Sequence, residues 1–158
     1  ILNSIRSMLK YLLMKTSRKE FAPLYKMVIE HENDVFMASS LGKKIAETYG
    51  LSKTDETKLV VSIIELTRNI VSYAGKGALF IEVIPNKGIK IIACDKGPGI
   101  KNLDDILNNR FRSKTGLGLG LSGVKRLMDE FSIETSNNGT KVTGIKYFRE
   151  RQENYVGY

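Results

Sequence analysis

Two polar side chains interrupt an apolar helical stripe near the middle of the chain. Glu65 and Asn69 are four positions apart within the stripe that runs from Leu59 to Val71. Residues at this spacing lie on one helical face. An asparagine oxygen can ligate magnesium that also holds phosphate oxygens, and a carboxylate can orient or deprotonate a hydroxyl. A structural polar patch, hydrogen-bonded to neighbouring backbone, has the same spacing, so both interpretations stay open here.

A second acid stands at the end of a β-branched apolar run. The run 91–94 predicts a buried strand, Asp95 ends it, and Gly97, Pro98 and Gly99 force a turn. A carboxylate held there can accept a hydrogen bond from an exocyclic amine such as that of adenine. An ordinary strand-to-loop turn explains the same residues. The stretch therefore needs support from the rest of the chain.

A glycine-rich run precedes the last helical pattern. Gly116, Gly118 and Gly120 alternate with leucines. Backbone amides and a helix N-terminus can converge on an anion at such a run. It lacks the Gly-Lys-Ser or Gly-Lys-Thr ending of a P-loop, and it does not follow the first strand as a dinucleotide fingerprint does. The run therefore argues against both of those folds.

The elements that must position these groups are helices and hairpins. The patterns predict a strand over 24–30, a helix from an Asp34 N-cap to about Tyr49, and a helix starting at Ser52 or Thr54. They then predict a hairpin of strands 78–84 and 88–95, a short helix over 103–107, a helix over 122–131, and a hairpin of strands 133–136 and 141–148. The sheet is therefore at least partly antiparallel. Because long connections are usually functional or disordered, we expect 102–120 to form a mobile lid.

Composition indicates one core, because the chain has 158 residues of which 42% are hydrophobic. We expect a basic amphipathic helix and linker over 1–20, a main domain over 21–149 and a charged tail over 150–158. The apolar face of 1–15 predicts contact with a partner protein or a second copy, giving a possible homodimer. Alternatively, this helix packs on the domain's own core.

Charge and cysteine content narrow the partners and the compartment. The formal net charge of +8 favours anionic partners. Nucleic acid is disfavoured because the basic residues are spread along the chain. No signal peptide or membrane-spanning stretch is visible, and the single Cys94 excludes an internal disulfide. We therefore expect a cytoplasmic protein that does not bind membranes.

The order of four motifs is more specific than any one of them. Glu65-x-x-x-Asn69 comes first, then Asp95-x-Gly97-x-Gly99, then the glycine run 116–120, then Gly139-Thr140. This order resembles the Bergerat-fold (GHKL) ATPases. Within that superfamily the chain is most similar to the small bacterial anti-sigma serine/threonine kinases of the switch-kinase type. The segments 65–70, 73–77, 95–100 and 120–131 carry the resemblance, which covers about 24–148.

The resemblance implies an α/β two-layer sandwich, in which helices cover one face of a mixed, mostly antiparallel sheet and ATP binds with Mg²⁺. Asp95 would bind the adenine amine, and Thr140 would support that contact. Asn69 would hold magnesium, and Glu65 would be the catalytic base. The remaining implied site residues admit the base or contact the phosphates: Gly97, Gly99, Ile100, Gly116, Gly118, Leu119 and Gly120. From charge and position alone, Lys114 or Arg112 is expected to neutralise the phosphates.

The implied function is phosphorylation of an antagonist protein with a STAS-type domain, acting by partner switching in bacterial stress or sigma-factor regulation. A serine phosphatase or a sigma factor would be a further partner. One alternative is a nucleotide-gated binding module that sequesters a sigma factor, or activates a phosphatase, without transferring phosphate. A histidine kinase catalytic domain is disfavoured, because no long helical hairpin precedes His31.

Overall fold

The computed structural model describes residues 23–108 and 120–149. The described elements follow in this order: β1 (Leu24–Ile29), α2 (Glu32–Tyr49), α3 (Lys53–Asn69), η1 (Ile70–Ala74), β2 (Gly77–Ile84), β3 (Gly88–Asp95), α4 (Leu103–Leu107), α5 (Gly120–Leu127), β4 (Glu130–Ser136) and β5 (Gly139–Tyr147). The predicted helix over 1–15, its linker, the tail 150–158 and most of the predicted lid lie outside the described residues. None of the described helices has the length and apolar character that a membrane span needs.

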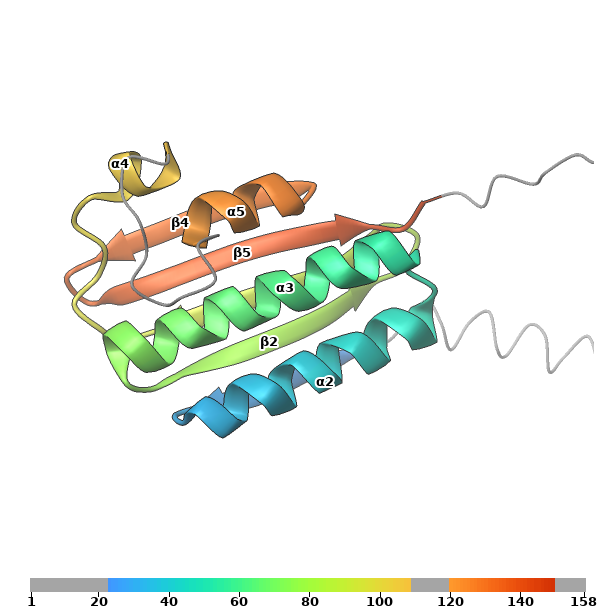
Figure 1. Ribbon diagram of the computed structural model, residues 1–158, viewed down its shortest axis with the longest axis horizontal. Coiled ribbons are helices and arrows are strands. Elements are labelled where there is room, and N and C mark those ends of the chain that lie inside the picture. The colour runs from blue at the N-terminus through green and yellow to red at the C-terminus, as the bar shows by residue number, and fades with distance from the viewer. Residues whose placement is uncertain (1–22, 109–119, 150–158) are drawn as a thin grey trace, which may run out of the picture.

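The strands form one sheet in the order β1-β2-β3-β5-β4, and all four neighbouring pairs of described strands are antiparallel. α2, α3 and α5 cover one face of this sheet (Figure 1). The predicted α/β two-layer sandwich is therefore confirmed. The sheet was expected to be mixed, but β5 lies between β3 and β4. The position of β5 keeps two strands that run in the same direction from pairing with each other.

The core lies between α3 and the covered face of the sheet. Leu59, Ile63 and Leu66 of α3 are almost completely buried, as are Ile81 and Ile91 on the central strands. Burying an aliphatic side chain of this size contributes about 1.5–3 kcal/mol. α3 is therefore held firmly against β2, β3 and β5, and side chains along its length have defined positions over the sheet.

The boundaries of α2 and α3 show which capping signals were assigned correctly. Ser52 caps α3, because its hydroxyl accepts a hydrogen bond from the Asp55 backbone N–H at 3.1 Å. Gly50 ends α2 in the left-handed region with φ 85°, as expected. The Asp34 N-cap was wrong. The helix begins at Glu32, and the Asp34 carboxylate instead accepts hydrogen bonds from the backbone N–H groups of the two residues before the helix, each at 2.9 Å.

The helix expected over 122–131 was also wrong at its end. α5 stops at Leu127, and Phe131 lies in β4. The Asp129 backbone N–H donates to the Ile145 carbonyl at 2.9 Å, so the chain has already joined the sheet there. Phe131 packs against the hydrophobic core from β4. Pairing with β5 therefore overrides the helical pattern.

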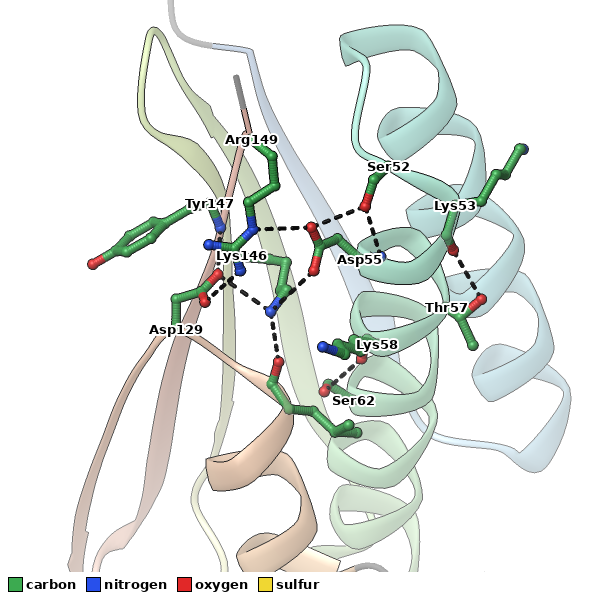
Figure 2. Close-up of polar contacts among 11 residues, drawn as sticks. Ser52, Lys53, Asp55, Thr57, Lys58, Ser62, Asp129, Lys146, Tyr147 and Arg149 are labelled. Atoms are coloured by element: carbon green, nitrogen blue, oxygen red, sulfur yellow. Dashed lines mark hydrogen bonds and ion pairs between the residues drawn. The ribbon is translucent and has the colours of Figure 1, made fainter. Parts of the chain in front are cut away.

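A buried ionic network closes one end of the helix layer (Figure 2). The Lys146 side chain is 2% exposed, and its Nζ lies 3.3 Å from Asp55 Oδ1 and 3.2 Å from Asp129 Oδ2. Lys146 also donates to the Leu127 carbonyl at 2.9 Å. Arg149 contacts the same two carboxylates, at 3.2 Å from Asp55 and 2.7 Å from Asp129. The network thus joins the first turn of α3, the segment after α5 and the end of β5.

The two carboxylates are stabilised in their ionised form. Burial alone would raise the pKa of Asp55, but hydrogen bonds from Ser52, Lys146 and Arg149 outweigh burial, and the pKa is lowered. Burial likewise opposes ionisation of Asp129, and hydrogen bonds from the Tyr147 backbone, Arg149 and Lys146 lower its pKa. A carboxyl group with a lowered pKa in the folded state stabilises the fold above its ordinary pKa and loses this contribution as pH falls. The network is therefore sensitive to acid.

Lys146→Met should destabilise the fold by about 3–5 kcal/mol at pH 7, because it leaves the half-exposed Arg149 as the one cation that contacts Asp55 and Asp129 among the described residues. The free energy of unfolding in urea measures this loss. Lys90→Met is the matched control, since Lys90 Nζ lies 3.9 Å from Glu82 in a partly exposed pair. The control should lose at most about 1 kcal/mol. Equal losses in the two variants would contradict a special role for the buried network.

Candidate functional site

A polar row ends the helix-covered face of the sheet. On this face the neighbouring strands β3, β5 and β4 carry the apolar residues Ala93, Val142 and Ile133 opposite one another. Two residues closer to the turn that follows β3, each of these strands carries a polar residue instead. There Asp95 is opposite Thr140, and Thr140 is opposite Thr135. Directly opposite residues of antiparallel strands share a face and lie close together. Asp95, Thr140 and Thr135 are called the polar row below.

The turn after β3 folds back onto the polar row. The Asp95 Oδ1 atom accepts a hydrogen bond from the Gly97 backbone N–H at 2.8 Å. Three residues later the Ile100 backbone N–H donates to Thr135 Oγ1 at 2.9 Å. Gly99 makes this path possible, because its φ is +80° and a Cβ there would meet the Ser136 carbonyl oxygen. The turn therefore contacts the Asp95 carboxylate through Gly97 and contacts β4 through Ile100.

The end of α3 meets this turn through a short π-helix. Asn69 is the last residue of α3, and η1 begins directly after it. The Gly75 backbone N–H closes η1 by donating to the Ile70 carbonyl at 2.8 Å. A Cβ on Gly97 would lie only 2.8 Å from the Ala74 Cβ, so the glycine allows η1 and the turn to approach each other. π-helical turns are frequent at functional sites.

Glu65 is a buried acid without a conventional partner. Its residue is 1% exposed, and neither carboxylate oxygen has a hydrogen-bond partner among the described residues. Burial raises the pKa of Glu65. A hydrogen bond from the Gly120 backbone N–H, too imperfect in geometry to count as a standard one, and the charge of Arg68 act in the opposite direction and offset only part of this effect. Gly120 begins the described part of α5 and is the last glycine of the predicted phosphate loop. The carboxylate therefore faces the place where that loop ends.

Arg68, between Glu65 and Asn69 in sequence, joins α3 to α2. Its Nε lies 3.1 Å from a carboxylate oxygen of Glu32 in the first turn of α2. Asn69, on the next position, is half-buried and belongs to the end of α3 that contacts η1. Asn69 thus lies at the end of α3 that continues through η1 toward the turn after Asp95.

Other predicted residues divide into those near the site and those outside the described ranges. Gly97, Gly99 and Ile100 form the turn beside Asp95. His31 caps α2 instead, with Nε2 3.9 Å from Glu30, and it is not part of the polar row. Arg112, Lys114, Gly116, Gly118 and Leu119 lie outside the described residues.

Thr135 is a site residue that the sequence reasoning missed. Its Oγ1 lies 2.9 Å from Thr140 Oγ1 and accepts the Ile100 N–H. The signal was present in the second hairpin, whose turn pairs Ser136 with Gly139. That register necessarily places Thr135 opposite Thr140. Extending the pairing by one residue from the Asn-Asn-Gly turn would have found it.

Comparison with known proteins agrees with this geometry. Residues 35–146 match the family described as Histidine kinase-like ATPase domain. The chain belongs to this family. It is also 43% identical over 122 residues to the serine/threonine-protein kinase RsbT of Bacillus subtilis (strain 168), a match that covers 75% of this chain and 92% of RsbT. This similarity supports the predicted assignment to the kinase branch of the family.

A solved structure supports the fold of the family. A crystal structure of the RsbU and RsbW domains of Rv1364c from Mycobacterium tuberculosis matches with a TM-score of 0.60 and 15% sequence identity. The match covers 80% of this chain but 33% of that chain, so the present chain spans about a third of that protein. At this level of identity the likeness shows the shared fold alone.

Glu65→Gln should raise the melting temperature at pH 8, because it replaces a carboxylate whose charged form is disfavoured by burial with a neutral group of the same size. A carboxyl with a raised pKa in the folded state contributes stability below its ordinary pKa and loses this contribution as pH rises through the folded-state pKa. The difference between variant and wild type should therefore shrink as pH falls. Thermal unfolding between pH 4 and pH 8 measures it.

Glu134→Gln is the matched control for this experiment, because Glu134 is exposed on β4. It should leave the melting temperature unchanged at every pH. If Glu65→Gln instead lowers the melting temperature at pH 8, the carboxylate has a stabilising partner and our interpretation of its burial is wrong.

Proposed function

We propose that this chain is an ATP-dependent protein serine/threonine kinase of the anti-sigma or switch-kinase type. The observation that carries the proposal is the buried Glu65 carboxylate, which lacks a hydrogen-bond partner among the described residues and faces the start of α5. Such a group destabilises the fold, so it needs a functional reason. A base for phosphoryl transfer supplies that reason. The similarity to a curated serine/threonine-protein kinase supports the same conclusion.

The described residues fit a nucleotide with an adenine base. The Asp95 carboxylate is half-buried at the end of the polar row, where it can accept a hydrogen bond from the exocyclic amine. Gly97 leaves out a side chain that would collide with η1, and Gly99 supplies the backbone conformation of the turn. In this proposal the adenine ring would lie beside Asp95, against the backbone of this glycine-containing turn. Glycines 116, 118 and 120 would then wrap the phosphates, with Lys114 as a charge partner.

Asn69 would hold magnesium in this proposal. The described residues contain no group of three or more His, Cys, Asp or Glu side chains that could hold a metal ion. A magnesium ion at Asn69 would therefore depend on nucleotide phosphate oxygens for most of its ligands, as is usual for this ion. When bound, it would neutralise charge on the phosphates.

Glu65 would act on the protein substrate. Its carboxylate takes the proton from a serine or threonine hydroxyl while that oxygen bonds to the γ-phosphorus and the bond to the leaving ADP oxygen breaks. The raised pKa makes the ionised carboxylate a stronger base than an exposed glutamate. Arg68, paired with Glu32, keeps α2 and α3 in register around this base.

The partners follow from the same proposal. The substrate would be an antagonist with a STAS-type domain, and a serine phosphatase or a sigma factor would be the second partner in a switch. The alternative is a nucleotide-gated binding module that captures such a partner without transferring phosphate. The burial of Glu65 without a standard hydrogen bond among the described residues favours the kinase, because a purely binding module has no use for a buried base.

Asp95→Asn should weaken ATP binding by about 1–3 kcal/mol, because the amide can present a donor where the adenine amine also donates. Titration calorimetry with ATP and magnesium measures the change. Glu134→Gln is the matched control, since Glu134 is exposed on the face of β4 opposite the polar row, and the variant should bind ATP like the wild type. Unchanged affinity in Asp95→Asn would remove Asp95 from the adenine site.

Glu65→Gln should slow phosphorylation of a STAS-type partner by about 10²- to 10⁴-fold, because it removes the general base. ATP affinity should change little, since the carboxylate does not hold the nucleotide in this proposal. Transfer of labelled phosphate and nucleotide affinity are measured on one preparation. Loss of both would make Glu65 a structural residue. Undiminished transfer would exclude it from the mechanism, and no transfer by the wild type to any antagonist would favour the binding module.

A further inference from the structure

The sheet has a second face, which α2, α3 and α5 leave uncovered because all three lie on the other side (Figure 1). On β2 and β3, alternate residues such as Leu79, Ile81 and Ile91 are buried beneath the helices. On β1, Tyr25 and Met27 pack against the same core. Successive side chains of a strand point to opposite faces, so the residues between these point to the open face.

Apolar side chains gather on one half of this open face, where β1, β2 and β3 lie side by side. The same rows continue across β5 and β4 as Thr143, Lys141, Ser132 and Glu134, which are polar. An exposed apolar patch with a polar rim is typical of an interaction site. The open apolar patch, as it is called below, consists of Leu24, Val28, Ala78, Phe80, Ile92 and Cys94.

The edge of the patch on β1 is the most accessible part. Leu24 is 62% exposed and Val28 is 48% exposed, which is unusual for large apolar side chains on a sheet. Lys26 lies between them, and its Nζ is 5.7 Å from the centre of the Phe80 ring. A lysine stem is flexible, so the ammonium group can move to the rim while the stem stays on apolar surface. The patch can therefore accept an apolar occupant without burying the Lys26 charge.

The chain enters the sheet beside this patch. The Pro23 carbonyl accepts a hydrogen bond from the Val83 backbone N–H at 3.0 Å, which fixes the chain directly before β1. The three strands of the patch have a combined width of about 10 Å between the outer two. The connection 16–22 spans up to about 25 Å when extended. Residues 1–15 are therefore tethered within reach of every part of the patch.

The segment 1–15 carries an apolar stripe that suits such a surface. A helix over these residues would be about 22 Å long, close to the length of about 26 Å expected for a strand of eight residues such as β2. Arg6, Lys10 and Lys15 stand between the apolar positions, and the segment contains no acid. The apolar residues recur at helical spacing: Ile1, Ile5, Met8, Leu9, Leu12 and Leu13.

We propose that the segment 1–15 forms a helix that packs its apolar stripe on the open apolar patch and so adds a third layer to the sandwich. The tether gives the segment a local concentration in about the millimolar range, which favours it over a second copy of the chain at lower protein concentration. Residues 35–146 carry the match to the family, so this layer lies outside the matched part of the chain. The inference does not depend on the proposed function.

Cys94 provides a direct test, because it is the single cysteine of the chain and belongs to the patch. The rate at which iodoacetamide alkylates Cys94 is measured by mass spectrometry on the folded full chain. Leu12→Asp places a charge in the middle of the apolar stripe and should release the segment from the patch. Cys94 should then react about tenfold faster than in the wild type, because it no longer waits for a local opening.

Ser7→Asp is the matched control, because it adds the same charge on the opposite side of the predicted helix. It should leave the alkylation rate at the wild-type value. Circular dichroism and unfolding in urea verify that the domain is folded in each variant, so faster alkylation is not a sign of general unfolding. If Leu12→Asp does not fold, Leu12→Ala is compared with Ser7→Ala in the same way.

The dependence on protein concentration identifies the occupant. Protection of Cys94 that is the same in dilute and concentrated protein, and that only the Leu12 variant loses, would support the inference. Equal alkylation rates in the wild type, Leu12→Asp and Ser7→Asp would overturn it. Protection that grows with protein concentration, together with a dimer in light scattering, would assign the patch to a second copy and also overturn it.

Discussion

The burial of α3 against the middle of the sheet is the constraint on which the other features depend. A helix of 17 residues is about 25 Å long, so α3 reaches from one end of the sheet to the other. Asp55 in its first turn is bound by Lys146, and its last residues continue into η1 beside the turn after β3. Packing of its apolar stripe between these ends prevents α3 from sliding or rotating. Glu65 is thereby held over the start of α5.

Buried carboxylates toward the two ends of α3 differ in how well they are paired. At one end, Asp55 is almost completely buried but pairs with Lys146 and Arg149. At the other end, Glu65 is equally buried, and the described residues give it no hydrogen-bond partner. Buried ion pairs in which every charge is matched hold neighbouring elements together. A lone carboxylate in the same layer has a cost in stability, and such costs concentrate where function requires them.

Glycines with positive φ shape the backbone around the Asp95 turn. Gly75 and Gly99 both have positive φ and lie beside the Asp95 turn, one ending η1 and one within the turn itself. Gly97 lets the turn approach η1, and Gly99 lets it approach the Ser136 carbonyl, more closely than a side chain at either position would allow. At this end of β3, β5 and β4, the polar row makes hydroxyl contacts in place of apolar packing. The site thus depends on glycines in the turn, which have no side chains, and on the strand register, which places the polar residues opposite one another.

Local signals in the sequence predicted most of the secondary structure. The Ser52 cap, the Gly50 helix end and the two hairpin turns are determined within a few residues, and each was assigned correctly. The motif order also identified the family, and it named Glu65 and Asp95 as the acids of interest. Errors arose at Asp34, which supports the helix start from inside the first turn, and at Phe131, where a helical pattern competed with strand pairing.

The sequence by itself therefore determined the order of elements, the antiparallel hairpins and which acids stand near glycine-rich turns, because those properties depend on neighbours along the chain. Only the tertiary structure decided that Lys146 is buried between Asp55 and Asp129, since these residues are far apart in sequence. It also decided that Glu65 is buried without a partner and that Thr135 meets the Ile100 backbone. Burial and long-range hydrogen bonds depend on how separate elements pack, and a pattern confined to one segment does not contain that information.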